Sequence, residues 1–116
     1  MVMQTFPQST VLIVDDVENN VNLLERVLRK LKVKVLSAFN GVDGLALLVA
    51  NPVVIVLVDF TMPGMDGYAV LRHIREIYDL QTLPVILISA LSEEADVVEG
   101  LDIGANDYIV KPFSNK

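Results

Sequence analysis

Residues 53–59 read VVIVLVD, and FTMPGMDG follows at 60–67. A run this rich in valine and isoleucine is typical of a β-strand that is covered on both faces. The run ends on a carboxylate, Asp59, and a Pro-Gly turn signal follows within a few residues. The sequence therefore predicts a buried central strand with an acid at its tip.

Further short apolar runs of strand length lie on both sides of this segment, at 11–15, 33–38, 84–89 and 107–111. Helical patterns separate them. In the first, Val17, Val21, Leu24, Leu28 and Leu31 recur at helical spacing, with Asp16 where the N-cap is expected. A second helix follows Asn40-Gly41 and ends near Asn51-Pro52.

Local signals also predict the two later helices. Asp66 is placed to cap a helix that begins after the Pro-Gly turn. A fourth helix is expected from Ser92 or Glu93 to about Ile103, with Gly104 at its C′ position. Alternating strands and helices predict an α/β fold with a doubly wound parallel sheet, and we expect a single domain over residues 1–116.

Composition excludes several classes of function. The net charge of −6 argues against direct nucleic-acid binding. We expect no membrane segment and no signal peptide, because no apolar run approaches spanning length. The chain has no cysteine, which fits a reducing compartment, and we expect a cytoplasmic location.

Polar, chemically capable side chains end four of the five expected strands: Asp15 with Asp16, Asp59, Ser89 and Lys111. Each alone has an ordinary explanation as a turn former, cap or surface residue. The carboxyl ends of parallel strands lie at one edge of a sheet, so together they predict a site. Three carboxylates suit Mg²⁺, with Mn²⁺ as an alternative, and a lysine and a hydroxyl can hold an anion. This set favours phosphoryl transfer to a carboxylate. His73 lies mid-helix and is expected at the surface.

These residues resemble the receiver domain of two-component response regulators, the chemotaxis-regulator type. VLIVDD, DFTMPGMDG, the Ser89-Ala90 pair and GANDYIVKPF match the family's motifs, and the resemblance runs from Val11 to Phe113. It implies a flavodoxin-like sheet with strand order 2-1-3-4-5. It also implies a domain that catalyses only its own phosphorylation and dephosphorylation.

The resemblance also implies roles for individual residues. Asp59 matches the phosphoacceptor, and the metal ligands would be Asp15, Asp16, Asp59 and the backbone carbonyl of Thr61. Lys111, Ser89 and the backbone N–H of Ala90 would bind the phosphoryl group. Ser89 and Tyr108 would form the switch.

The implied partners are a histidine kinase or phosphotransfer protein and an output domain or downstream protein. The output would read the fourth helix and fifth strand, where acids gather at Glu93, Glu94, Asp96, Glu99 and Asp102. A basic partner is therefore expected.

The sequence departs from the family pattern after Phe113, where a fifth helix is usual. We expect exposed apolar surface beside the first and fifth strands. A fragment of a longer regulator or hybrid kinase, a homodimer or domain swap, and a naturally truncated form all remain open. In the family that the chain resembles, the positions of Thr61 and Leu91 tune the lifetime of the phosphoryl group. Neither residue offers an acid or amide to orient water, so the resemblance implies a long-lived phosphoryl group.

Three other functions fit parts of the sequence. A dehalogenase-type phosphatase would need a second acid where Thr61 stands. A pseudo-receiver would usually lack the acceptor or the acidic pair. A flavodoxin-like cofactor binder would need a glycine- or hydroxyl-rich phosphate loop after the first strand.

Overall fold

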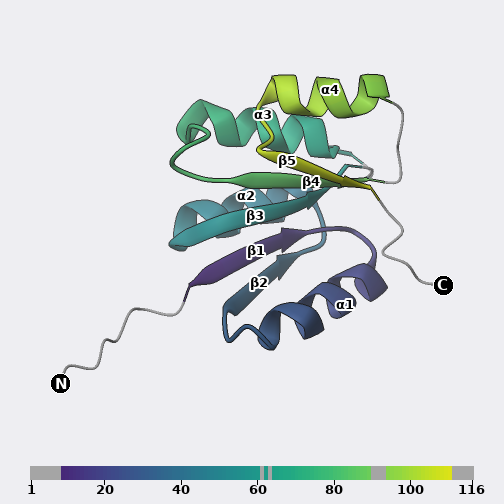
Figure 1. Ribbon diagram of the computed structural model, residues 1–116. Helices are drawn as coiled ribbons and strands as arrows, with labels where there is room; N and C mark the ends of the chain where they lie inside the picture. Colours follow the sequence, from purple (N-terminus) through teal and green to yellow (C-terminus); the bar gives the residue numbers. More distant parts are fainter. Residues whose placement is uncertain (1–8, 61, 63, 90–93, 111–116) are drawn as a thin grey trace.

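The computed structural model describes residues 9–60, 62, 64–89 and 94–110. Five strands and four helices alternate along this part of the chain (Figure 1). Their bounds are β1 Thr10–Val14, α1 Glu18–Arg29, β2 Lys34–Ala38, α2 Gly41–Ala50, β3 Val53–Asp59, α3 Gly67–Ile77, β4 Val85–Ser89, α4 Glu94–Ile103 and β5 Asp107–Val110.

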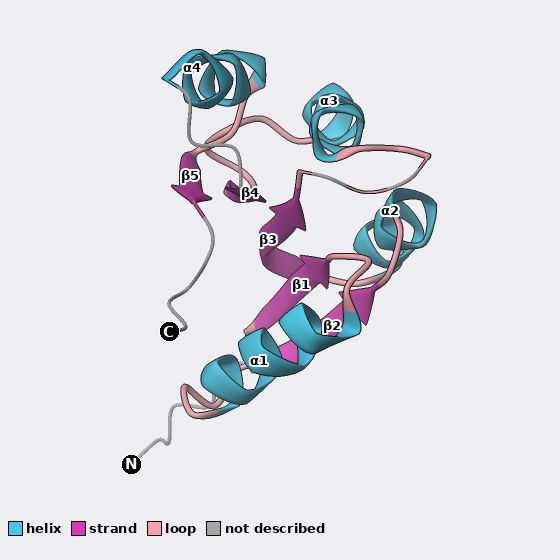
Figure 2. Cartoon of the chain, turned by 90° about the vertical axis from the view of Figure 1, so that its right-hand side faces the viewer, coloured by secondary structure: helices cyan, strands magenta, loops and turns pink. Residues whose placement is uncertain are grey.

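The strands form one parallel sheet in the order β2-β1-β3-β4-β5. This confirms the predicted fold class and the central place of β3. Figure 2, which looks along the sheet, places α2, α3 and α4 on one face and α1 on the other. The chain order reverses between β1 and β3, so the crevice beyond their carboxyl ends is where such folds place ligands.

The main core lies between the sheet and helices α2, α3 and α4. Alternate strand residues supply it, among them Val56 and Val58 of β3, both fully buried. Leu71 and Ile74 of α3 face them, with at most 1% of their surface exposed. The alternate residues Ile55 and Leu57 are only half-buried, so the unbroken apolar run of β3 is covered more completely on the face of α2, α3 and α4 than on the other.

Helix α2 is apolar on nearly every side. Leu48 is buried, yet Val42 and Val49 of the same helix are 64% and 63% exposed. Gly44 faces β1, and a Cβ atom at that position would lie 2.7 Å from Val14 Cγ2. The close approach of α2 to β1 therefore depends on the missing side chain at Gly44.

Arg75 of α3 ties the amino ends of β4 and β5 together. Its Nε donates to the Gly104 carbonyl at 2.7 Å, and its Nη1 donates to the Leu83 carbonyl at 2.8 Å. Its Nη2 donates to Asn106 Oδ1 at 2.8 Å. One guanidinium thereby fixes three segments at the end of the sheet away from the strand-end acids.

The local predictions for the caps have mixed outcomes. Asp66 caps α3 by accepting from the Ala69 N–H at 2.9 Å, and α4 ends at Ile103 before Gly104, as predicted. The prediction that Asp16 caps α1 is wrong, because the N-cap residue is Val17.

Exposed apolar surface was predicted beside the first and fifth strands, and only the fifth strand, β5, shows it. Ile109 and Val110 of β5 are each 41% exposed, as expected. The expectation is wrong for β1, all of whose residues are buried. Within the described ranges, no helix combines the length and apolar character needed to cross a membrane.

Candidate functional site

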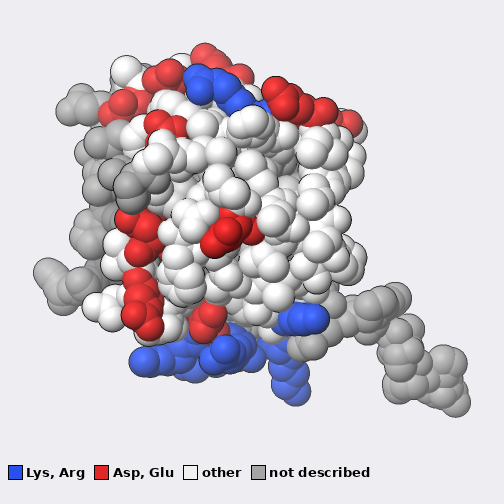
Figure 3. Space-filling view, turned by 180° about the vertical axis from the view of Figure 1, so that it is seen from behind, with Lys and Arg blue, Asp and Glu red and all other residues white. Residues whose placement is uncertain are grey.

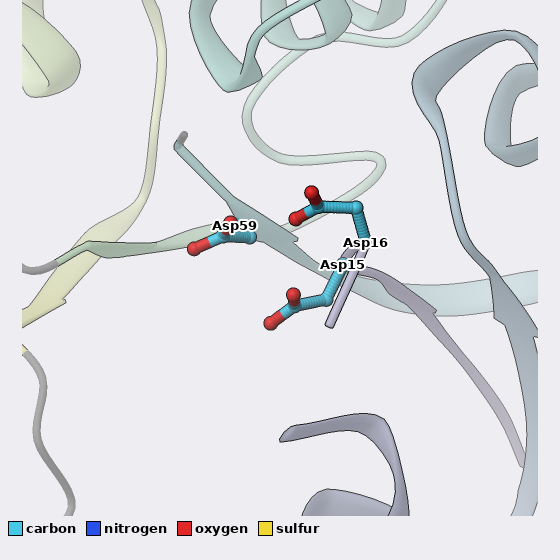
Figure 4. A group of neighbouring side chains, drawn as sticks. All are labelled: Asp15, Asp16 and Asp59. Atoms are coloured by element: carbon cyan, nitrogen blue, oxygen red, sulfur yellow. The ribbon is translucent and has the colours of Figure 1, made fainter. Parts of the chain in front are cut away.

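Three carboxylates meet at the carboxyl ends of β1 and β3 (Figure 4). Asp15 directly follows β1 and Asp59 is the last residue of β3, while Val14 and Val58 are paired in the sheet. Parallel register therefore brings Asp15 and Asp59 side by side. Ligand oxygens of Asp15, Asp16 and Asp59 all lie within 4.8 Å of one another.

Asp15 is held in place by two hydrogen bonds. Its Oδ1 accepts from the Val17 N–H at 2.9 Å, and its Oδ2 accepts from Asn20 Nδ2 at 3.2 Å. The residue as a whole is 2% exposed. The local turn that starts α1 is thus made by Asp15, which explains why Asp16 is not the cap.

Asp16 is exposed, and its carboxylate turns toward that of Asp59 (Figure 4). Asp59 itself is only 4% exposed. The cluster therefore combines two sheltered acids with one that reaches solvent. Like charges at this spacing repel one another unless a cation lies between them. Carboxylates are hard oxygen ligands, so the donor set fits a divalent cation such as Mg²⁺.

The loop after Asp59 is closed by backbone contacts. The Gly67 N–H donates to the Phe60 carbonyl at 2.8 Å, and the Phe60 N–H donates to Ile88 of β4 at 2.9 Å. A Cβ atom at Gly67 would lie 2.7 Å from both the Asp59 carbonyl oxygen and Phe60 Cα. Helix α3 therefore begins in direct contact with the backbone that carries the acid.

Ser89 lies beside the acids, at the end of the neighbouring strand. Asp59 pairs with Ile88 across β3 and β4, so Ser89 is one residue beyond that pair, and it is fully buried. Tyr108 of β5 pairs with Leu87 and is half-buried. Its ring packs against α4, because a Cβ atom at Gly100 would lie 3.1 Å from Tyr108 Cδ2.

The structure accounts for part of the predicted site. It brings together Asp15, Asp16 and Asp59 and places Ser89 on the adjacent strand. Thr61, Ala90 and Lys111 lie outside the described residues, so their predicted roles stay predictions. His73 is exposed on α3, as expected.

Sequence reasoning assigned no role to Tyr68, which links helices α3 and α4. Its hydroxyl donates to the Asp96 carbonyl at 2.9 Å, and its ring meets Phe60 edge-on at a centroid distance of 4.4 Å. Burial raises the pKa of the Tyr68 phenol above its usual 10.0, and the nearby Glu99 carboxylate raises it further. The phenol therefore stays protonated and keeps donating. No local sequence pattern identifies this contact, because Tyr68 and Asp96 are distant in the chain.

Comparisons with known proteins point to one family. The model of the response regulator receiver domain matches residues 11–116. The response regulator PleD of Caulobacter vibrioides is 39% identical over 105 residues, which is 90% of this chain and 23% of PleD. The chain spans less than half of the curated relatives it matches.

Solved structures agree. The response regulator TrrA of Thermotoga maritima, in complex with Mg²⁺-BeF, superimposes with a TM-score of 0.80 at 29% identity, covering 92% of this chain and 90% of TrrA. The CheX-CheY-BeF₃-Mg²⁺ complex of Borrelia burgdorferi gives a TM-score of 0.84 at 34% identity, covering 91% of this chain and 80% of the matched chain. With its sheet order, its strand-end acids and these matches, the chain belongs to the response regulator receiver domain family of two-component signalling.

Proposed function

We propose that this domain accepts a phosphoryl group on Asp59 from a histidine kinase or a phosphotransfer protein. The observation that carries the proposal is the carboxylate cluster, in which Asp59 ends the central strand beside Asp15 and Asp16. A nucleophile must be rigidly held and reachable. Asp59 meets the first need through its strand and through the contact of its carbonyl with Gly67.

The metal ligands in this proposal are Asp15, Asp16, Asp59 and the backbone carbonyl of Thr61. Bound Mg²⁺, or Mn²⁺, would neutralise charge that develops on the transferred phosphoryl group. The hydrogen bonds from Val17 and Asn20 fix the carboxylate of Asp15, so that ligand is oriented before any cation arrives.

In the transfer step, one Asp59 carboxylate oxygen attacks phosphorus as the bond to the donor histidine nitrogen breaks, and the donor keeps the electron pair. Lys111, the Ser89 hydroxyl and the Ala90 N–H would hold the phosphoryl oxygens. Ser89 is suited to this role because it ends β4 one residue past the partner of Asp59. Transfer to water would later free Asp59.

The proposed switch runs from Ser89 to Tyr108. When the Ser89 hydroxyl bonds the phosphoryl group, the Tyr108 ring moves toward the space beside it and changes the surface of α4 and β5. The packing of Tyr108 against α4 supports this coupling. An output domain or downstream protein with basic residues would bind this surface. The transfer of the phosphoryl group from the kinase would take place in the cytoplasm.

The test is phosphorylation with acetyl phosphate and Mg²⁺, followed by intact-protein mass spectrometry. Asp59→Asn is expected to take no phosphoryl group while keeping the circular dichroism spectrum of the wild type. Glu76→Gln, which removes an exposed acid on α3, is the control and is expected to label normally. Labelling of Asp59→Asn at the wild-type rate would overturn the assignment.

A further inference from the structure

Helix α1 carries an exposed apolar ridge. Leu23 and Val27 on the helix, and Leu31 in the turn after it, are 42%, 51% and 67% exposed. They recur at every fourth position and so form one ridge along the helix surface. Arg26 and Lys30, also exposed, form the adjacent row. The outward side of α1 is therefore apolar along its centre and basic along one flank.

Helix α4 carries the complementary surface. A shallow hollow of about 610 Å³ lies along it, lined by Ala95, Val98, Glu99, Asp102 and Ile103. The positions 95, 99 and 103 form one row and 98 and 102 form the next, so a groove runs between them. Val98 is 47% exposed, and Glu99 and Asp102 are exposed acids. The lining of this groove is therefore apolar at Ala95, Val98 and Ile103 and acidic at Glu99 and Asp102.

The two surfaces lie at opposite ends of the molecule. In Figure 1, α1 is below the sheet and α4 is above it, and Figure 2 agrees. In the reverse view of Figure 3, Lys and Arg side chains gather along the lower edge, while Asp and Glu predominate at the upper edge beside one basic group. One copy cannot bring its own α1 to its own α4, but two copies can.

We propose that copies of this chain associate head to tail, with the α1 ridge of one copy in the α4 groove of the next. A row of side chains spaced by four fits a groove spaced by four, which is the commonest way for two helices to pack. Arg26 and Lys30 of one copy then face Glu99 and Asp102 of the other. Because the two surfaces differ, the contact is heterologous and can extend to further copies.

The size of the contact sets its strength. One helix against another buries less than the roughly 1,600 Å² of a standard stable interface, so the association is weak and concentration-dependent. The net charge of −6 opposes self-association at long range. Salt at about 0.1 M screens this long-range repulsion more than it screens the attraction between charges in contact. Comparison of the wild type with charge-reversed variants at one salt concentration therefore isolates the local attraction.

The test uses two charge-reversed variants in sedimentation velocity at up to about 1 mM protein and low salt. Arg26→Glu with Lys30→Glu reverses α1, and Glu99→Lys with Asp102→Lys reverses α4. Each variant alone is expected to have an association constant lower by about tenfold or more, because like charges then meet. Circular dichroism melts establish that each variant is folded.

An equimolar mixture of the two variants separates this arrangement from a two-fold dimer. The α1-reversed chain keeps a native α4 groove, and the α4-reversed chain keeps a native α1 ridge. The reversed α1 of the first chain and the reversed α4 of the second also carry opposite charges, so the mixture is expected to regain association and to extend beyond heterodimers, whereas a two-fold dimer stops at two copies. A chain with all four reversals is expected to regain self-association. Reversal of two exposed charges on α3, Arg72→Glu and Glu76→Lys, is the control and should leave association unchanged.

Two results would overturn the proposal: a monomer at the highest concentration, or association that the reversals do not change. The second would assign self-association to another apolar surface, such as the outward side of α2. The contact between the α1 ridge and the α4 groove uses the same helix as the proposed output surface, but it does not depend on phosphorylation. Asp59→Asn is expected to associate as the wild type does, so either proposal can fail while the other stands.

Discussion

Neutralising Asp16 is expected to change stability in opposite directions with and without a divalent cation. Oxygens of Asp15, Asp16 and Asp59 lie within 4.8 Å of one another. At that separation two unit charges repel by about 3 kcal/mol at an effective dielectric constant near 20 and by about 1 kcal/mol in bulk water. Asp16 is exposed, so the weaker repulsion expected in bulk water applies to its interaction with Asp15 and to its interaction with Asp59. Asp16→Asn should therefore stabilise the domain by about 1–2 kcal/mol in EDTA and low salt.

In saturating Mg²⁺ we expect the wild type to be more stable than Asp16→Asn. A cation at 100 times its dissociation constant stabilises the wild type by about 2.7 kcal/mol, whereas Asp16→Asn has lost one ligand and gains much less. The assay is urea unfolding followed by circular dichroism, in EDTA and in saturating Mg²⁺. Glu76→Gln, at an exposed acid of α3, is the control. The reasoning would be refuted if Asp16→Asn were less stable than the wild type in EDTA, or if Mg²⁺ stabilised both equally.

Two further predictions concern residues that position the site and the sheet. Gly67→Ala places a methyl group 2.7 Å from the Asp59 carbonyl oxygen, and the backbone there cannot easily move away. We therefore expect the free energy of unfolding in urea to fall by about 2–3 kcal/mol and Asp59 to be labelled more slowly. Unchanged stability would contradict the close approach. Arg75→Met removes three hydrogen bonds of 2.7–2.8 Å and should cost about 3–5 kcal/mol in the same assay, whereas the exposed Arg72→Met should change stability by less than about 0.5 kcal/mol. Equal effects of the two arginine substitutions would refute the role given to Arg75.

The sheet and its acids could be predicted because the sequence signals are local. The parallel register of the strands then brings their carboxyl ends to one edge of the sheet. Apolar runs mark the strands, and each run that ends on a polar residue places that residue at the same edge of the sheet. Asp66 could be identified as a cap for a similar reason, because a capping side chain bonds a backbone N–H only three residues away. Nothing in this reasoning needed contacts between distant parts of the chain.

The errors and omissions arise where neighbouring residues compete or where distant ones meet. Asp15 and Asp16 are adjacent and chemically identical, and only the structure assigns the Val17 N–H to Asp15. Arg75 reads as an ordinary helix-surface residue, yet its guanidinium bonds the Gly104 carbonyl, 29 positions away. Such contacts depend on the angle between packed elements, which sequence periodicity does not encode.

The packing of α2 has a consequence for how the domain reaches its native arrangement. Most surface helices are oriented by polarity, since only one side of them is apolar. Helix α2 is apolar nearly all round, so hydrophobic burial alone scarcely distinguishes one rotation about its axis from another. The side chain of Val14 packs where a side chain at position 44 would otherwise lie, so close packing against Gly44 selects one rotation of α2. Selection among rotations of α2 therefore depends on close packing at Gly44 rather than on the polarity of its surface.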